Sequence, residues 1–220
     1  MAKTGASAAP VSRTSRGDAT RHRLIDAAVE TLKEHGYAGA SARVIAERAG
    51  VNQGLIFYHF DSVAGLLLAA LDAVSAMRRA RYGAAVDEVD SPADLVAVAS
   101  AVFREDLDAG HVAVLVAMIA GAATTPGLGD EVAQRIAPWT EFARDAVAGV
   151  LADSPLGSVV PAESVGFAVV ALYLGMEMLT QLGGDRAPAN ALFDQALRLA
   201  TVLGAIGGAD GSTRQTDPSR

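Results

Sequence analysis

Apolar residues recur along this chain at intervals of three and four, the spacing that places them on one face of an α-helix. Leu24, Ala28 and Leu32 form the first such stripe, and similar stripes return in later segments. No segment alternates apolar and polar residues as a half-buried strand would. The pattern predicts an all-α fold, with two short helices within residues 41–60 and longer ones over 20–35, 62–86, 92–109, 112–120, 128–151, 161–182 and 190–206.

Residues 41–60 predict two helices joined by a tight turn. Ser41 can cap the first helix with its hydroxyl, and Gly50 can end it because glycine adopts the left-handed conformation at little cost. Asn52 is the expected cap of the second helix, which Ile56 and Phe60 anchor to the core. A compact pair of this kind is a helix-turn-helix, whose second helix enters the major groove of DNA.

The outward residues of the second helix support this interpretation. Gln53 can read an adenine edge with two hydrogen bonds, and Leu55 or Phe57 can contact a thymine methyl group. Tyr58 and His59 can donate to phosphate oxygens, which positions a protein without reading sequence. Consecutive aromatic residues cannot all point inward on one helix, so they cannot all be core residues.

The segment from Leu24 to Leu67 carries an ordered set of motifs: Leu24-Ile-Asp-Ala-Ala28, Leu32, Gly36-Tyr37, Ile45-Ala-Glu-Arg-Ala-Gly-Val51, Gly54, Ile56-Phe-Tyr-His-Phe60, Ser62 and Leu66-Leu67. This set resembles the TetR-type family of bacterial one-component transcriptional repressors. The chain departs from the family at two positions. Val63 replaces the usual Lys, which typically contacts phosphate in the family, and Phe57 replaces a frequent Tyr, which removes one hydroxyl. The expected DNA contacts are Ser41, Arg43, Asn52, Gln53, Gly54, Leu55, Phe57, Tyr58 and His59.

The resemblance also implies a role for the rest of the chain. In this family the last two helices pair with those of a second subunit, and the preceding helices enclose a pocket for a small-molecule inducer that releases the repressor from palindromic operator half-sites. Small residues such as Gly166, Gly175, Ala196 and Ala200 fit a homodimer, although some must serve packing within the chain. For any single candidate a place in the core is the better interpretation, because Met and aromatic residues fill cores everywhere. The candidates for the pocket wall are Phe103, His111, Met118, Trp139, Phe142, Tyr173, Met176 and Glu177.

The charge distribution changes what the overall charge suggests. A net charge of −7 over 220 residues argues by itself against nucleic acid. Residues 1–61, however, hold eight Lys/Arg and six Asp/Glu, a net of +2, whereas residues 62–220 carry a net of −9. The mildly basic end is therefore the end with the helix-turn-helix, and the acidic remainder would be held away from DNA.

Composition also bears on compartment and organisation. The chain lacks cysteine, which fits the cytoplasm, and its longest uncharged apolar runs, of twelve residues, are short of the ~20 that a membrane span needs. We expect a disordered tail over 1–19, a DNA-binding unit over 20–66, a ligand-binding and dimerisation domain over 67–206 and a disordered tail over 207–220. Arg78, Arg79 and Arg81 are expected on a solvated helix face.

Two rival interpretations come from other classes of protein. An all-α enzyme finds little support, because the chain has no P-loop, no His-Glu-x-x-His and no cofactor or metal motif, and its four His residues have unrelated spacings. A ligand-binding protein with a degraded DNA unit is suggested by Val63 and Phe57. The residues that oppose it are Gln53, Gly54, Tyr58 and His59. The sequence favours a transcriptional regulator that is not an enzyme.

Overall fold

The structure, a computed structural model, describes residues 13–152, 157 and 159–209. Every regular element within these residues is a helix, which confirms the all-α prediction. The helices are α1 (Arg13–Gly39), α2 (Ala42–Ala49), α3 (Gly54–Phe60), α4 (Val63–Asp87), α5 (Pro92–Ala109), α6 (His111–Ala122), α7 (Leu128–Leu151), α8 (Ala162–Gly183) and α9 (Ala187–Ala209).

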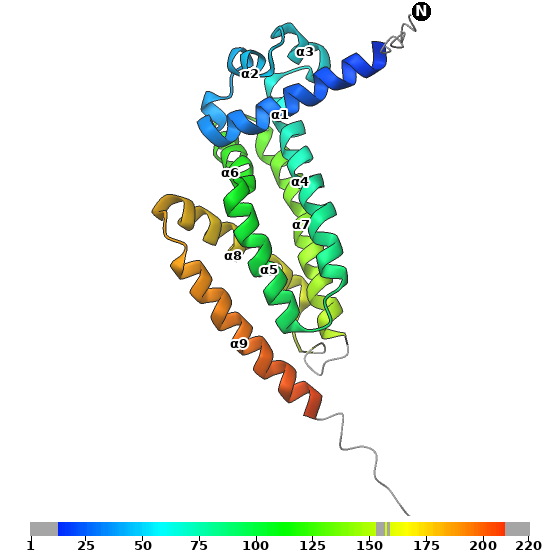
Figure 1. Ribbon diagram of the computed structural model, residues 1–220, viewed down its shortest axis with the longest axis vertical. Helices are drawn as coiled ribbons and strands as arrows, with labels where there is room; N and C mark the ends of the chain where they lie inside the picture. Colours follow the sequence, from blue (N-terminus) through cyan, green and yellow to red (C-terminus); the bar gives the residue numbers. More distant parts are fainter. Residues whose placement is uncertain (1–12, 153–156, 158, 210–220) are drawn as a thin grey trace, which may run out of the picture.

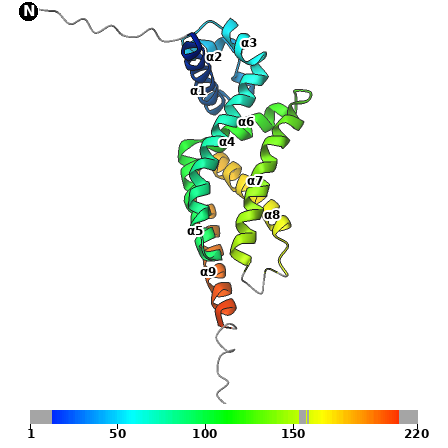
Figure 2. The same cartoon turned by 90° about the vertical axis from the view of Figure 1, so that its right-hand side faces the viewer.

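Helices α1, α2 and α3 lie together at one end of an elongated molecule, and α4 leads from them into the helical body (Figure 1). In the body, α8 packs chiefly against α7, and α9 packs against α5 (Figure 2). The end of α9 points away from α1–α3. Because α1–α3 lie together at one tip, that tip can approach another molecule. Helix α4 connects it to the body.

One apolar core joins the tip to the body. Leu24 from α1, Ile45 from α2 and Ile56 from α3 are fully buried in the same cluster as Val114 and Met118 from α6. Burial of this kind contributes roughly 1.5–3 kcal/mol for each large apolar side chain. The helix-turn-helix is therefore held on the body by packing as well as by the chain itself.

The tightest part of that seam lies between α1 and α6. Gly36 bends α1 with a φ of 63°, which turns Tyr37 toward α6. The Tyr37 ring lies directly against Gly121, where a Cβ atom would be 2.3 Å from the ring Cγ. Thr125 Oγ1 donates to the Tyr37 hydroxyl at 3.2 Å. Glycine at position 121 is thus required for the close approach of the two helices.

The structure corrects the predicted ends of the outer helices. Helix α1 starts at Arg13 rather than Thr20, so residues 13–19 of the predicted disordered tail are helical. Once a helix is nucleated, each added residue gains a backbone hydrogen bond, so a cap residue such as Thr20 need not mark the start. Helix α9 runs from Ala187 to Ala209 rather than 190 to 206. The predicted tails over 1–12 and 210–220 lie outside the described residues.

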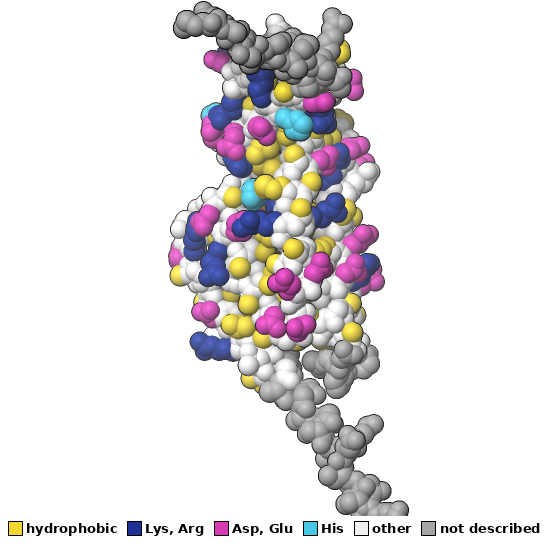
Figure 3. Space-filling view, turned by 45° about the vertical axis from the view of Figure 1, so that its right-hand side comes forward, with side chains coloured by type: hydrophobic (Ala, Val, Ile, Leu, Met, Phe, Trp, Pro, Cys, Tyr) yellow, Lys and Arg dark blue, Asp and Glu magenta, His cyan; other side chains and the backbone are white. Residues whose placement is uncertain are grey.

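Charged side chains of both signs are interspersed over the body on the face that Figure 3 shows. That face offers no continuous basic surface, in keeping with the acidic balance of residues 62–220. The prediction of a solvated face for the arginines of α4 is wrong for one of them, because Arg78 is only 8% exposed.

Candidate DNA interface and ligand cavity

Helix α2 is closed at both ends as its sequence predicts. The Ser41 hydroxyl accepts from the Val44 backbone N–H at 3.4 Å, and Gly50 ends the helix in the left-handed region with a φ of 65°. Ile45 and Ala46 face the core, while Ser41 and Arg43 are exposed. The caps fix where α2 stops and so set the direction in which the chain enters α3.

Helix α3 starts from an asparagine cap. The Asn52 side-chain oxygen accepts from the backbone N–H of Gly54, the first residue of α3, at 2.8 Å. A Cβ atom at Gly54 would lie 3.1 Å from that oxygen, so glycine keeps the cap uncrowded as well as leaving the backbone uncovered. The predicted capping role of Asn52 is confirmed.

Helix α3 has two buried residues on one side and two exposed aromatic residues on the other. Ile56 and Phe60 are buried at 0% and 8% exposure, as the sequence predicts. On the other side Phe57 is 49% exposed and Tyr58 is 79% exposed. An exposed aromatic pair on a short helix is unusual for a surface that meets only water, because burying such rings is strongly favourable.

The remaining predicted contacts surround this pair. Gln53 is exposed, Leu55 and His59 are half-buried, and the His59 ring meets the Tyr58 ring edge-on with centroids 4.9 Å apart. The Arg21 guanidinium lies 5.2 Å from the centroid of the Phe60 ring, which brings a cation beside α3. Val63, where the resembled family has Lys, packs against the core instead.

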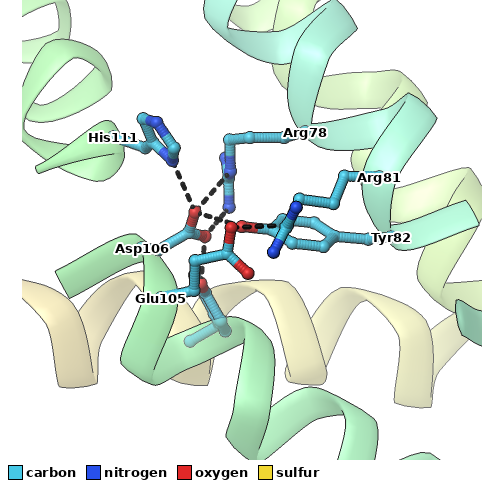
Figure 4. A network of polar contacts seen from close by, with 7 residues as sticks. Arg78, Arg81, Tyr82, Glu105, Asp106 and His111 are labelled. Atoms are coloured by element: carbon cyan, nitrogen blue, oxygen red, sulfur yellow. Dashed lines mark hydrogen bonds and ion pairs between the residues drawn. The ribbon is translucent and has the colours of Figure 1, made fainter. Parts of the chain in front are cut away.

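A buried polar network joins α4, α5, α6 and α8 (Figure 4). Asp106 on α5 accepts from Arg78 Nε at 3.0 Å, from the Tyr82 hydroxyl at 2.7 Å, and from Arg78 Nη2. His111 Nδ1 lies 3.0 Å from the same carboxylate, and the Tyr173 hydroxyl donates to it. Asp106 is fully buried, yet it is paired with a cation and hydrogen-bonded on both oxygens.

The electrostatics of the network follow from this geometry. Burial by itself raises the pKa of the Asp106 carboxyl, but the Arg78 guanidinium and the two tyrosine hydroxyls outweigh burial, so the pKa lies below its ordinary value. Burial and the neighbouring carboxylate raise the pKa values of Tyr82 and Tyr173. Asp106 is therefore an anion, Arg78 a cation, and both tyrosines remain protonated at neutral pH.

Beside this network lies a cavity of about 470 Å³ between α4, α5, α6, α7, α8 and α9. That volume falls within the range of roughly 300–1,000 Å³ typical of small-molecule sites. Its wall is almost wholly apolar. Of the residues predicted for a pocket wall, Trp139, Phe142 and Tyr173 line the cavity.

The other five predicted residues lie outside the cavity wall. Phe103 is sealed among the rings of Tyr173 and Phe193, and Met118 is part of the core that reaches the helix-turn-helix. His111 turns to Asp106, Met176 is half-buried elsewhere on α8, and Glu177 is fully buried. These residues have the chemistry of a pocket wall but sit on other faces of their helices.

Sequence reasoning missed Arg78, Tyr82 and Asp106. The α4 stripe of Leu71 and Val74 continues through Arg78 and Tyr82 at helical spacing, and all four are buried. An arginine in line with an apolar stripe is the signal that could have identified it. Its partner was beyond reach, because sequence spacing does not tell which of several acidic residues on α5 faces α4.

Comparison with known proteins gives the family. Residues 24–70 match the family model described as bacterial regulatory proteins, tetR family. A helix-turn-helix transcriptional regulator of Mycobacterium tuberculosis is 32% identical over 133 residues, which cover 60% of this chain and 67% of that protein. This chain belongs to the TetR family of bacterial regulatory proteins. The TetR-family relatives are transcriptional regulators, and this chain is a DNA-binding regulator of transcription.

Solved structures agree with the TetR fold over nearly the whole chain. A TetR-family regulator from Cytophaga hutchinsonii has a TM-score of 0.72 at 19% identity, covering 87% of this chain and 96% of that one. The regulator FadR from Bacillus subtilis, solved in complex with stearoyl-CoA, has a TM-score of 0.65 at 17% identity, covering 81% and 96%. At these identities the likeness establishes the TetR fold alone.

Proposed function

We propose that this TetR-family regulator is a cytoplasmic homodimeric repressor that binds a palindromic operator through α3 and leaves it when a small apolar molecule fills the cavity. In this proposal residues 20–66 are the DNA-binding unit and residues 67–206 the ligand-binding and dimerisation domain. The observation that carries it is the exposed face of α3, where Phe57 and Tyr58 stand out while Ile56 and Phe60 hold the helix in place.

The proposed DNA contacts divide by chemistry. Gln53, at the exposed start of α3, reads a base edge, and Phe57 with Leu55 contacts thymine methyl groups. Tyr58 and His59 donate to phosphate oxygens. Ser41, the cap of α2, and Arg43 within α2 are both exposed and approach the DNA backbone from the other side of the turn. Gly54 has no side chain, so the main chain there and at Asn52 can come close to the DNA strand.

Exposed apolar side chains on α8 support the homodimer. Leu172, Leu179 and Leu182 are 53%, 72% and 83% exposed and lie along one stripe of the helix. By length and composition α8 could also cross a membrane, but one such helix is weak evidence of a membrane span. Covering these exposed leucines with a second copy of the chain is favourable. Two copies would also place two recognition helices about 34–36 Å apart on DNA.

The small residues of the last helices divide between this interface and the chain's own packing. A Cβ atom at Gly166 would lie 2.6 Å from the Arg144 backbone nitrogen, so that glycine permits close packing of α8 on α7. Ala196 and Ala200 line the cavity. The proposed interface therefore uses the leucine stripe of α8 more than these small residues.

Release by a ligand rests on linkage between the cavity and α3. A ligand shifts the protein only by binding one arrangement more tightly than another. Helix α4 lines the cavity at Arg78 and Tyr82 and begins beside α3, so a tilt of α4 alters the separation of two recognition helices. FadR of B. subtilis was solved with stearoyl-CoA, which has a long apolar chain, and this favours an apolar effector.

The experiment is selection of genomic fragments by the purified chain, followed by affinity measurement on the selected site and on random duplex. We expect specific binding by a dimer, with sedimentation giving twice the mass of one chain at micromolar concentration. Leu179→Glu with Leu182→Glu should give monomers that keep their helicity and lose specific binding. A chain that selects no fragment, or a parent that sediments as a monomer, would contradict the proposal.

A further inference from the structure

The cavity is long and has one polar end. Along α7 its wall extends from Ile136 to Leu151, a distance of about 22 Å at the helical rise of 1.5 Å per residue. The polar side chains of the wall gather in one place, because Arg78, Tyr82 and Tyr173 all contact Asp106, and the Arg78 guanidinium lies 4.6 Å from the Trp139 ring centroid. A matching ligand is elongated and carries its polar group at one end.

Most hydrogen-bonding capacity at this end is already used. The Asp106 carboxylate accepts hydrogen bonds from four side chains and has no donor of its own. The four are Arg78, Tyr82, Tyr173 and His111. Arg78 uses Nε and Nη2 on Asp106, and within the described residues Nη1 donates to no partner. Among the described residues, the side-chain polar atoms that are both fully buried and without a hydrogen-bond partner are the two carboxyl oxygens of Glu177. Nη1 of Arg78 is not one of them, so this nitrogen is accessible. Arg78, a residue of the cavity wall, therefore has one N–H donor left for a ligand.

The charges around this donor disfavour ionic head groups. The Arg78 cation is already balanced by Asp106, so a second anion would lose its hydration without an unpaired cation to replace it. Glu177 stands fully buried near both groups and adds negative charge whenever it ionises. An ammonium group is disfavoured for a different reason, because the side chain that faces the cavity is itself a cation.

We propose that the cavity binds an elongated, uncharged, apolar molecule whose one polar end is a carbonyl-type hydrogen-bond acceptor for Arg78 Nη1. The chemical class covers esters, ketones, lactones and amides with a long apolar part. The inference rests on the proposed function only in taking this cavity as the effector site. It goes further in naming the ligand's head group and the residue that selects it.

The test compares three probes with one chain length and different heads: methyl decanoate, decanoate and decylammonium. Trp139, the one tryptophan of the chain, lies against Arg78, so its fluorescence reports binding without DNA. Methyl decanoate should bind roughly tenfold or more tightly than either ion, the difference expected for one hydrogen bond to a charged donor without an uncompensated charge. Equal or tighter binding of decanoate or decylammonium would overturn the proposal.

A matched pair of variants identifies the residue. Arg78→Lys keeps the positive charge beside Asp106 but loses the planar guanidinium, which can bind Asp106 with two nitrogens and still present the third to a ligand. The variant should bind methyl decanoate roughly tenfold more weakly. Arg81→Lys is the control, because Arg81 lies one turn along α4, pairs with Glu105 at 2.5 Å and is outside the cavity wall. Two variants that bind like the parent would refute the role of Arg78.

The three probes are measured with the parent chain, so they test the proposed ligand class even if Arg78→Lys folds poorly. Their outcome also stays separate from the proposed function. Tight, head-selective binding of methyl decanoate that leaves operator affinity unchanged would support the ligand class and contradict release by ligand. If decanoate or decylammonium binds more tightly than the ester and releases the chain from its operator, the proposed function is supported and the proposed ligand class is contradicted.

Discussion

Among the described residues the helical body buries charged side chains and the helix-turn-helix tip does not. In α1–α3 the ion pairs, such as Lys33 with Glu30 and Arg43 with Glu47, lie at the surface, and among the described buried residues Thr31 is the polar one. Its hydroxyl donates to the Ala27 carbonyl within the same helix. In the body Arg78, Asp106 and Glu177 are all buried.

The difference teaches what each region is built to do. The tip has an apolar inside and a polar or aromatic outside, an arrangement that gives a rigid unit with one outward binding face. The body places a charged pair beside an apolar cavity, an arrangement that costs desolvation and is stable only while each charge keeps its partner. The first two predictions that follow concern the buried charges of the body, the third the seam between tip and body, and the last the outward face of the tip.

The largest expected effect is the loss of Asp106. Asp106→Ala leaves the Arg78 cation buried and several donors without an acceptor, and should lower the free energy of unfolding by about 3–5 kcal/mol. Glu105→Ala, the neighbouring residue in an exposed pair with Arg81, should cost about 1 kcal/mol or less. Urea unfolding of the two variants measures both, and equal losses would show that the buried pair is not special.

The second prediction concerns pH and Glu177. Burial, reinforced by the Asp106 charge, raises the pKa of this carboxyl from 4.5 to about 7. The folded chain then holds a proton that the unfolded chain has lost, so the free energy of unfolding falls as pH rises from about 4.5 to about 7 and levels off above.

Glu177→Gln removes that pH dependence. The variant should exceed the parent in stability above pH 7 by roughly 3 kcal/mol, and the gap should close toward low pH. Glu163→Gln, an exposed carboxyl on the same helix, is the control and should leave the slope as it is. A parallel pair of stability curves for the parent and Glu177→Gln would mean that this carboxyl has an ordinary pKa.

The third prediction tests the seam between tip and body. Gly121→Ala places a Cβ atom into the Tyr37 ring and should cost about 1–3 kcal/mol, the usual penalty for overpacking. Gly129→Ala, at an open helical position with nothing within 4 Å, should instead be neutral or stabilising by about 0.4–1 kcal/mol. Thermal unfolding of both separates crowding from any general effect of alanine.

The sequence allowed much more of the tip to be predicted than of the body. The caps at Ser41 and Gly50 and the buried anchors Ile56 and Phe60 are local signals, and each lies where its pattern predicts. The Arg78–Asp106 pair depends on two helices meeting in register, which residue spacing within either helix does not encode. The predicted start of α1 at Thr20 was wrong for a related reason, because a helix that has already formed can extend toward its N-terminus without a further sequence signal.

The pocket residues show the same limit from the other side. Trp139, Phe142 and Tyr173 line the cavity, whereas Phe103 and Met118 of similar chemistry are core. Large apolar side chains fill cores and cavity walls alike, so the residue type alone does not distinguish the two. Only the arrangement of the helices around the cavity does.

Two variants on the exposed face of α3 test most directly whether this face binds DNA. On the selected site and on random duplex, measured across salt concentrations, Tyr58→Ala should weaken both to a similar extent, by about 0.5–1.5 kcal/mol for one phosphate hydrogen bond. Gln53→Ala should weaken the selected site by about 1–3 kcal/mol and relax preference at one base position, with random duplex unchanged. If both variants bind the selected site as tightly as the parent, α3 is not the recognition helix.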